Sequence, residues 1–212
     1  MTQAHPKFEH LEGYANGALS EGMSLLVAAH VTYCPECRRT VTQIERLGAG
    51  FMMVSDTSEN VSPPSLEACM AALDAPVEEA EAPEDPHGIL PIPLRRALPA
   101  TLDEANWQFR LPGLHEYVLS DYEGEHVSLL RARPGVSIFH HAHEGEEATL
   151  ILSGAMEDGD HVFRRGDVAL ADETHQHKPR IIGDEVCYCL VVMSGSLRFT
   201  GPVGLALNLF TR

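Results

Sequence analysis

The chain has 212 residues, of which 44% are hydrophobic, and its 31 acidic and 15 basic side chains give a formal net charge of −16. This length allows one large domain or two small ones, each with an apolar core. The acidic balance argues against direct binding to nucleic acid, which requires a positive face for the phosphates. It suits a basic partner, such as a DNA-binding protein held off its DNA, although the charge alone favours nothing beyond solubility.

The given sequence shows no secretory or membrane signal. It has no N-terminal run with a basic end, an apolar centre and a small-residue cleavage site, and no stretch of roughly 20 apolar residues. Its five cysteines are arranged as Cys34 with Cys37, a lone Cys69, and Cys187 with Cys189. An odd count in this arrangement is not typical of a disulfide framework, so we expect a reducing, cytoplasmic location.

Residues 1–75 have the apolar spacing of helices. Ser20 and Ser65 are suited to cap helix N-termini, and Pro35 is suited to the first position of a helix. The glycines at 48 and 50 are expected to loosen the end of that helix. The sequence therefore predicts an all-α N-terminal domain of four helices.

A change of composition marks the domain boundary. Between Asp74 and Pro93 the chain carries six acidic residues and five prolines, and no basic residue appears before Arg95. Repulsion between carboxylates and the stiffness of proline favour an extended connector. We therefore assign residues 1–75 to the helical domain, 76–95 to an acidic, proline-rich linker, 96–195 to a second domain, and 196–212 to a C-terminal strand or tail.

Short apolar and alternating segments separated by turn residues dominate the chain after residue 98. The predicted strands lie at 107–111, 117–119, 127–131, 148–152, 161–163, 168–170, 187–192 and 197–200. Many short strands at this spacing indicate an all-β sandwich or barrel.

The first candidate metal site is the pattern His30-x3-Cys34-x2-Cys37. The two cysteines bracket the first turn of a predicted helix, and a structural zinc site is usually closed by four protein ligands. The fourth ligand available from the N-terminal segment is His5 or His10. The alternatives are a redox pair without metal, which would require a preceding strand, and inert thiols.

The second candidate site lies between Gly135 and Gly154. His141 and His143 point to one side of a strand, and Glu147 follows across a turn. Zinc, iron, nickel and copper all accept this set of nitrogen and oxygen ligands. The alternative is a histidine-rich surface strand.

The remaining thiols are interpreted as core residues. Cys187 and Cys189 share one face of a strand and are expected to be small buried residues, with an oxidisable role for them or for Met193 as the alternative. Cys69 is expected in the core of the fourth helix.

The spacing from Gly135 to Gly154 resembles the first cupin motif, Gly-x5-His-x-His-x3-Glu-x6-Gly, at every position. The resemblance implies a jelly-roll barrel and a third histidine in a second motif. His177 lies eleven residues after Gly166, where cupins place this ligand, and His175 is the competing candidate. The usual proline-glycine pair of the second motif is missing here.

The whole arrangement resembles the ChrR type of zinc-binding anti-sigma factor, whose first helix is similar to the run from Glu12 to Leu19. The resemblance implies two metal sites, with zinc expected in both although the metal of the cupin site is less defined. The sites carried over from the family are His5, His30, Cys34 and Cys37 for the first, and His141, His143, Glu147 and His177 for the second.

The same resemblance implies a regulator without catalytic activity. The N-terminal domain would grip an extracytoplasmic-function sigma factor in a one-to-one complex and keep it from RNA polymerase. Oxidative stress, such as singlet oxygen, would release it through the cupin-like domain. The alternative function is a metal-dependent cupin enzyme, a dioxygenase or isomerase, with an N-terminal extension. A cupin that responds to a bound small molecule also fits the sequence.

Overall fold

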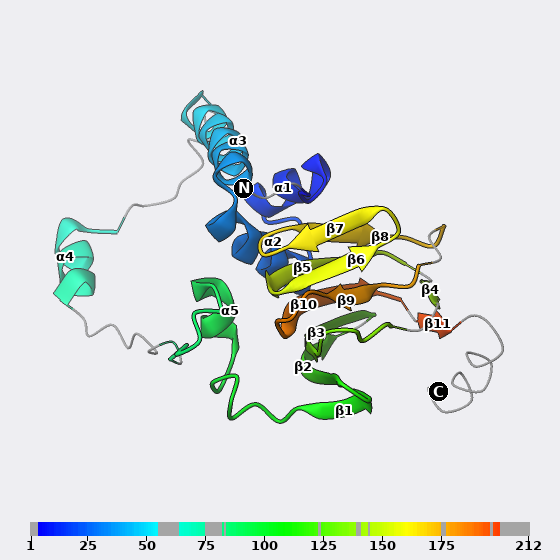
Figure 1. The fold of residues 1–212 in the computed structure, drawn as a ribbon. Helices are drawn as coiled ribbons and strands as arrows, with labels where there is room; N and C mark the ends of the chain where they lie inside the picture. The colour runs from blue at the N-terminus through cyan, green and yellow to red at the C-terminus, as the bar shows by residue number, and fades with distance from the viewer. Residues whose placement is uncertain are drawn as a thin grey trace.

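Figure 1 shows the computed structural model, in which N-terminal helices lie beside a C-terminal β structure. The structure describes residues 4–54, 64–74, 82, 84–122, 124–138, 141–143, 145–174, 177–195 and 197–199. The helices are α1 (Phe8–Ala15), α2 (Glu21–Tyr33), α3 (Pro35–Val54), α4 (Leu66–Asp74) and α5 (Ile92–Ala97). The strands are β1 (Gln108–Leu111), β2 (Leu114–Tyr122), β3 (Glu125–Ala132), β4 (His141–His143), β5 (Glu147–Ser153), β6 (Ala155–Asp158), β7 (His161–Arg164), β8 (Val168–Ala171), β9 (Arg180–Ile182), β10 (Cys187–Ser194) and β11 (Leu197–Phe199).

Three helix starts confirm the predicted capping residues. The Ser20 hydroxyl accepts a hydrogen bond from the Met23 amide, and the Ser65 hydroxyl accepts one from the Ala68 amide. Pro35 is the first residue of α3. That helix continues past the glycines at 48 and 50 to Val54, because a helical glycine costs only about 1 kcal/mol and does not forbid the conformation.

Within the described ranges, the β part contains a six-stranded and a three-stranded sheet with an apolar layer between them, and a separate two-stranded sheet. All neighbouring strands are antiparallel, in the orders β1-β2-β3-β10-β5-β8 and β7-β6-β9, and β11 pairs separately with β4. The inner layer includes Ile151 and Cys189 from the large sheet and Met156 and Ile181 from the small one. The described residues thus form a cupin-like two-sheet structure, whereas closure into a barrel stays a prediction.

Helix α2 joins the two parts of the chain. Its Leu26 and Ala29 are fully buried against the outer face of the large sheet, in one apolar cluster with Leu129, Leu150 and Leu190. Burying a leucine side chain stabilises a fold by about 2 kcal/mol. Helix α2 therefore shares the core of the β part, whereas α1 and α3 pack with α2 in a separate apolar cluster.

Helix α5 occupies the end of the stretch 76–95 that the sequence analysis assigned to a linker. Leu90 and Leu94 of this stretch are buried in the same cluster as α2. The proline content predicts an extended chain. Pro93 is nevertheless compatible with α5, because it lies in the first turn, where a backbone amide would have no partner within the helix. The assignment of the domain boundaries stays a proposal.

Helix α4 stands apart from the other helices in Figure 1. Its Leu66, Met70 and Leu73 are exposed, and so is Cys69. The prediction that Cys69 lies in a core is therefore wrong, because the apolar face of α4 has no apolar layer beneath it among the described residues. Within that part of the chain, no helix combines the length and apolar character needed to cross a membrane.

Candidate metal centres

The first candidate site lies where α1, α2 and α3 converge. His5 precedes α1, His30 is in the last turn of α2, Cys34 separates α2 from α3, and Cys37 is in the first turn of α3. One potential ligand atom from each of these residues lies within 4.8 Å of every other. His30, Cys34 and Cys37 are buried. The structure thus brings together four residues that the sequence analysis assigned to one metal ion.

The break between α2 and α3 places the two thiols on one side. Pro35 disfavours the helical region for the residue before it, and Cys34 has an extended backbone with φ −106° and ψ 102°. Its Sγ accepts a hydrogen bond of 3.4 Å from the Cys37 amide, as a helix-capping residue does. Since α3 starts immediately afterwards, the two thiols lie one turn apart at its N-terminus.

The two distances from His5 to the thiols fit a tetrahedral cation. His5 Nδ1 lies 3.4 Å from Cys34 Sγ and 3.4 Å from Cys37 Sγ. Bonds to zinc of about 2.0–2.3 Å separate tetrahedral ligands by about 3.3–3.8 Å. His10, the other candidate for the fourth ligand, instead places its Nε2 3.1 Å from Glu146 Oε2. The geometry therefore favours His5.

His30 is oriented by a carbonyl from the β part. Its Nδ1 lies 2.8 Å from the Gly166 carbonyl oxygen, which can only accept, so Nδ1 carries the proton. Its Nε2 is buried and has no hydrogen-bond partner among the described residues. A buried nitrogen without a partner is costly, and a metal ion would satisfy it. This orphaned atom and the set of two thiols and two imidazoles fit zinc.

Burial favours the neutral forms of His30 and Cys37. Burial lowers the pKa of His30 to about 4, so the imidazole is neutral at pH 7 and can donate a lone pair. Burial, with the neighbouring Cys34, raises the pKa of the Cys37 thiol to about 12. A positive charge among the ligands would reverse this shift, because metals bind the thiolate form.

The second candidate site lies at one end of the two-sheet structure. Glu147 begins β5, and His177 lies close enough for its charge to affect that carboxylate. His141 and His143 lie on β4, of which the structure describes the backbone but not these side chains. The competing ligand His175 is outside the described residues. The assignment of His141, His143, Glu147 and His177 to one metal stays a proposal.

Asp158 is a site residue that the sequence analysis missed. Its Oδ2 lies 2.7 Å from His177 Nδ1, which leaves Nε2 available to bind a metal. Burial lowers the pKa of His177, but the hydrogen bond and the charge of Asp158, together with Glu147, outweigh burial and raise it. Carboxylates that hold the second nitrogen of a ligand histidine are usual at metal sites. In the sequence, Asp158 is followed by Gly159 and Asp160, a pattern that indicates only a turn.

The carboxylate of Glu147 is itself perturbed. Burial raises its pKa, while the nearby His177 and a hydrogen bond of 3.1 Å from the Thr149 hydroxyl oppose the shift. A buried acid that is costly to ionise is stabilised as a carboxylate by a bound cation.

Cys187 and Cys189 lie in the apolar layer between the sheets, which confirms the prediction that they are buried core residues. A hydrogen bond with Cys187, in which the protonated Cys189 thiol is the donor, and burial raise the pKa of Cys189 well above its ordinary value. Thiols in this protonated state are poor nucleophiles.

Comparison with known proteins agrees with this geometry. A family model described as the ChrR cupin-like domain matches residues 96–197. The chain is similar to the anti-sigma-E factor ChrR of Cereibacter sphaeroides, at 32% identity over 190 residues, which cover 89% of this chain and 88% of that protein.

A solved structure extends the likeness to the tertiary level. The crystal structure of Rhodobacter sphaeroides SigE in complex with the anti-sigma ChrR contains a chain that is 30% identical to this one, with a TM-score of 0.79. The match covers 92% of this chain and 100% of that chain, so it includes both the helices and the sheets.

Proposed function

Because the chain belongs to the ChrR family of anti-sigma factors, we propose that it sequesters an extracytoplasmic-function sigma factor in a one-to-one complex. The observation that carries the proposal is a row of exposed apolar side chains on α3 and another on α4. On α3 the row comprises Leu47, Phe51 and Val54, and on α4 Leu66, Met70 and Leu73, all between 53% and 85% exposed. We call these six residues the apolar docking surface.

The spacing of the apolar docking surface indicates a partner. Both triplets have the spacing i, i+4, i+7, which puts three side chains on one side of each helix. Rows of exposed apolar side chains such as these mark protein interaction sites in soluble chains. The net charge of −16 supports a basic partner such as a sigma factor, whose attraction would speed the encounter.

The first metal site would hold the α3 part of this surface in place. When bound, zinc supplies a closed cross-link among four ligands. His5, His30 and Cys37 belong to the segments of α1, α2 and α3, so the cross-link would fix the direction in which α3 leaves the protein. A helical part of about 75 residues gains much of its stability from such a metal.

The second part of the proposal concerns release. We assign the sensing of oxidative stress, by singlet oxygen or a related oxidant, to the cupin-like part with a metal at His141, His143, Glu147 and His177. The partly buried Glu147 and the pair formed by Asp158 and His177 support a metal there. Zinc would make this a structural site, and a redox-active metal would allow chemistry with the oxidant.

The decisive experiment is co-expression of the full chain with candidate sigma factors, followed by co-purification and metal analysis. We expect a one-to-one complex and, per chain, one zinc ion that depends on Cys34 and Cys37. Replacing both with serine should abolish that zinc and the complex. The Cys69→Ser change, on an exposed thiol, is the control for the metal analysis and should retain the zinc. Tight binding by the double serine variant would refute the proposed role of the site.

Release is tested on the purified complex. Exposure to a photosensitiser and light should free the sigma factor from the wild-type chain and leave it bound to the His177→Ala variant. Equal release from both proteins would contradict the assignment of sensing to the cupin-like site.

A further inference from the structure

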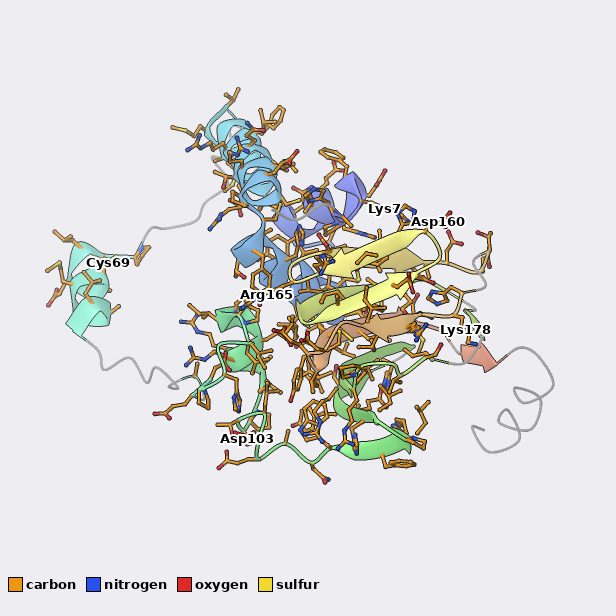
Figure 2. The ribbon with its side chains drawn as sticks, in the orientation of Figure 1. Lys7, Cys69, Asp103, Asp160, Arg165 and Lys178 are labelled. Carbon is orange, nitrogen blue, oxygen red and sulfur yellow. The ribbon has the colours of Figure 1, made fainter. Side chains whose placement is uncertain are left out.

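The turn that joins β7 to β8, residues Arg164 to Val168, contacts the N-terminal part of the chain at several points. Arg165, labelled in Figure 2, lies 5.2 Å from the ring centre of Tyr33 at the end of α2. The same guanidinium donates a hydrogen bond of 2.7 Å to the carbonyl oxygen of Gly88, ahead of α5. The turn is therefore anchored on the helical side of the molecule.

Ala4, the residue before His5, is held by this turn from two directions. Its amide donates a hydrogen bond of 3.2 Å to Asp167 Oδ1, and its carbonyl accepts one of 3.1 Å from the Val168 amide. These bonds fix the backbone at Ala4 and hence the position from which the His5 side chain reaches the thiols. A chain end without such bonds is usually mobile.

The second imidazole of the site depends on the same turn. The Gly166 carbonyl accepts the His30 Nδ1 proton at 2.8 Å, while Nε2 remains buried without a partner among the described residues. One turn of the β part thus determines the placement of both histidines of the N-terminal metal site.

Asp167 is the residue that holds the turn together. It is 4% exposed, and its Oδ2 accepts a hydrogen bond of 2.8 Å from the Arg164 amide while Oδ1 binds the Ala4 amide. The carboxylate is also near enough to act electrostatically on His30. Its negative charge would stabilise a cation at the site, in addition to fixing the geometry.

We propose that this turn is the outer coordination shell of the N-terminal metal site and that Asp167 is its positioning residue. This inference rests on the proposed zinc site at His5, His30, Cys34 and Cys37. It makes the metal affinity of the helical part depend on its docking to the cupin-like part. By thermodynamic reciprocity, metal binding must strengthen that docking by the same factor.

The test uses the full chain with Co²⁺ and then Zn²⁺. The bands of thiolate-bound Co²⁺ report on the Cys34 and Cys37 site separately from the proposed histidine and carboxylate site. Titration of the Co²⁺-loaded chain with Zn²⁺ removes these bands and gives the affinity of the thiolate site for Zn²⁺ relative to Co²⁺. In a separate titration, a chromophoric chelator competes with the chain for Zn²⁺. For Asp167→Ala we expect a loss of about 10–100-fold, typical of an outer-shell residue, and altered Co²⁺ bands.

Two further variants make the test specific. Asp167→Asn keeps one acceptor and should lose less affinity than Asp167→Ala. Asp184→Ala removes an exposed carboxylate from the turn between β9 and β10 and should match the wild type. If circular dichroism shows that Asp167→Ala does not fold, the Zn²⁺ affinity and the Co²⁺ bands of Asp167→Asn are compared with those of the wild type instead.

The outcomes separate this inference from the proposed function. Unchanged affinity and bands in a folded Asp167 variant would overturn the outer-shell role and leave the metal site intact. Failure of the wild-type chain to give thiolate bands would overturn both the site and the inference.

Discussion

At the scale of single residues, the buried carboxylate of Glu116 obtains its partners from the neighbouring strands of the large sheet. Glu116 on β2 is 8% exposed and binds three groups, the Arg110 guanidinium, the His126 ring at 2.8 Å, and the Ser128 hydroxyl. Burial alone would raise the pKa of this carboxyl, but the three hydrogen bonds and the charge of Arg110 lower it to about 2. A buried charge is tolerated only when it is this fully bonded.

The lowered pKa of Glu116 predicts a pH dependence. Its folded pKa of about 2 is below the usual 4.5, so its stabilising contribution is complete above pH 4.5 and is lost as the pH falls toward 2. A shift of this size corresponds to about 3 kcal/mol. In Glu116→Gln, urea unfolding at pH 7 should show reduced stability, and the decline between pH 4.5 and 2 should be shallower. A decline as steep as in the wild type would contradict the prediction.

At the scale of elements, α2 is fixed by a close approach to the large sheet. A methyl group at Gly22 would lie 2.5 Å from Val127 Cγ2 and 2.6 Å from Glu125 Oε2. Glu125 accepts hydrogen bonds from the Ser20 hydroxyl and from the Gly22 amide, at 3.0 Å, so a strand residue caps the N-terminus of the helix. The negative charge there is also favourable for the helix dipole.

We predict that Gly22→Ala destabilises the chain because it forces α2 away from β3. Overpacking of this kind costs about 1–3 kcal/mol, measured as a shift of the urea midpoint. The matched control is Gly48→Ala on α3, where nothing lies within 4 Å of the added carbon. That change should be neutral or stabilise by about 0.5–1 kcal/mol through helix propensity. A larger loss at position 48 than at 22 would contradict this account of α2.

The apolar docking surface also belongs to this scale. Phe51 is 74% exposed on α3, and a charge in its place would be buried by a bound partner. We predict that Phe51→Asp weakens sigma binding at least tenfold in a pull-down titration or by calorimetry, with zinc content unchanged. Ala49→Asp adds the same charge on the other side of α3 and should bind normally. Equal effects of the two changes would indicate a charge effect without specific docking.

At the scale of the whole molecule, the shared core predicts that metal and fold are coupled. Trp107 packs against the cluster that contains Leu26 of α2 and Leu150 of β5, so its fluorescence reports on the same core as the helices. A metal held at 100 to 1,000 times its dissociation constant stabilises a fold by about 2.7–4.1 kcal/mol.

We predict that a chelator lowers the thermal midpoint and that helical circular dichroism and Trp107 fluorescence shift together. Coincidence is expected because α2 cannot leave the sheet without exposing the common core. Melting of the helical signal while Trp107 stays unchanged would show that the two parts unfold independently.

The sequence by itself determined the local features. Helix starts at Ser20, Pro35 and Ser65 depend on hydrogen bonds or dihedral limits within a few residues, so they can be read without tertiary information. The spacing of Cys34 and Cys37 likewise sets two thiols on one helical turn. Except for β6 and β9, which were not predicted, the strands after residue 98 were predicted from short apolar and alternating segments.

Only the tertiary structure decided what depends on contacts across the chain. It selected His5 over His10, placed Asp158 behind His177, and exposed Cys69 because α4 has no apolar partner among the described residues. It also joined Gly166 to His30, 136 residues apart. Local patterns specify which side chains face the same way, whereas the partner that each one meets depends on how the helices pack on the sheet.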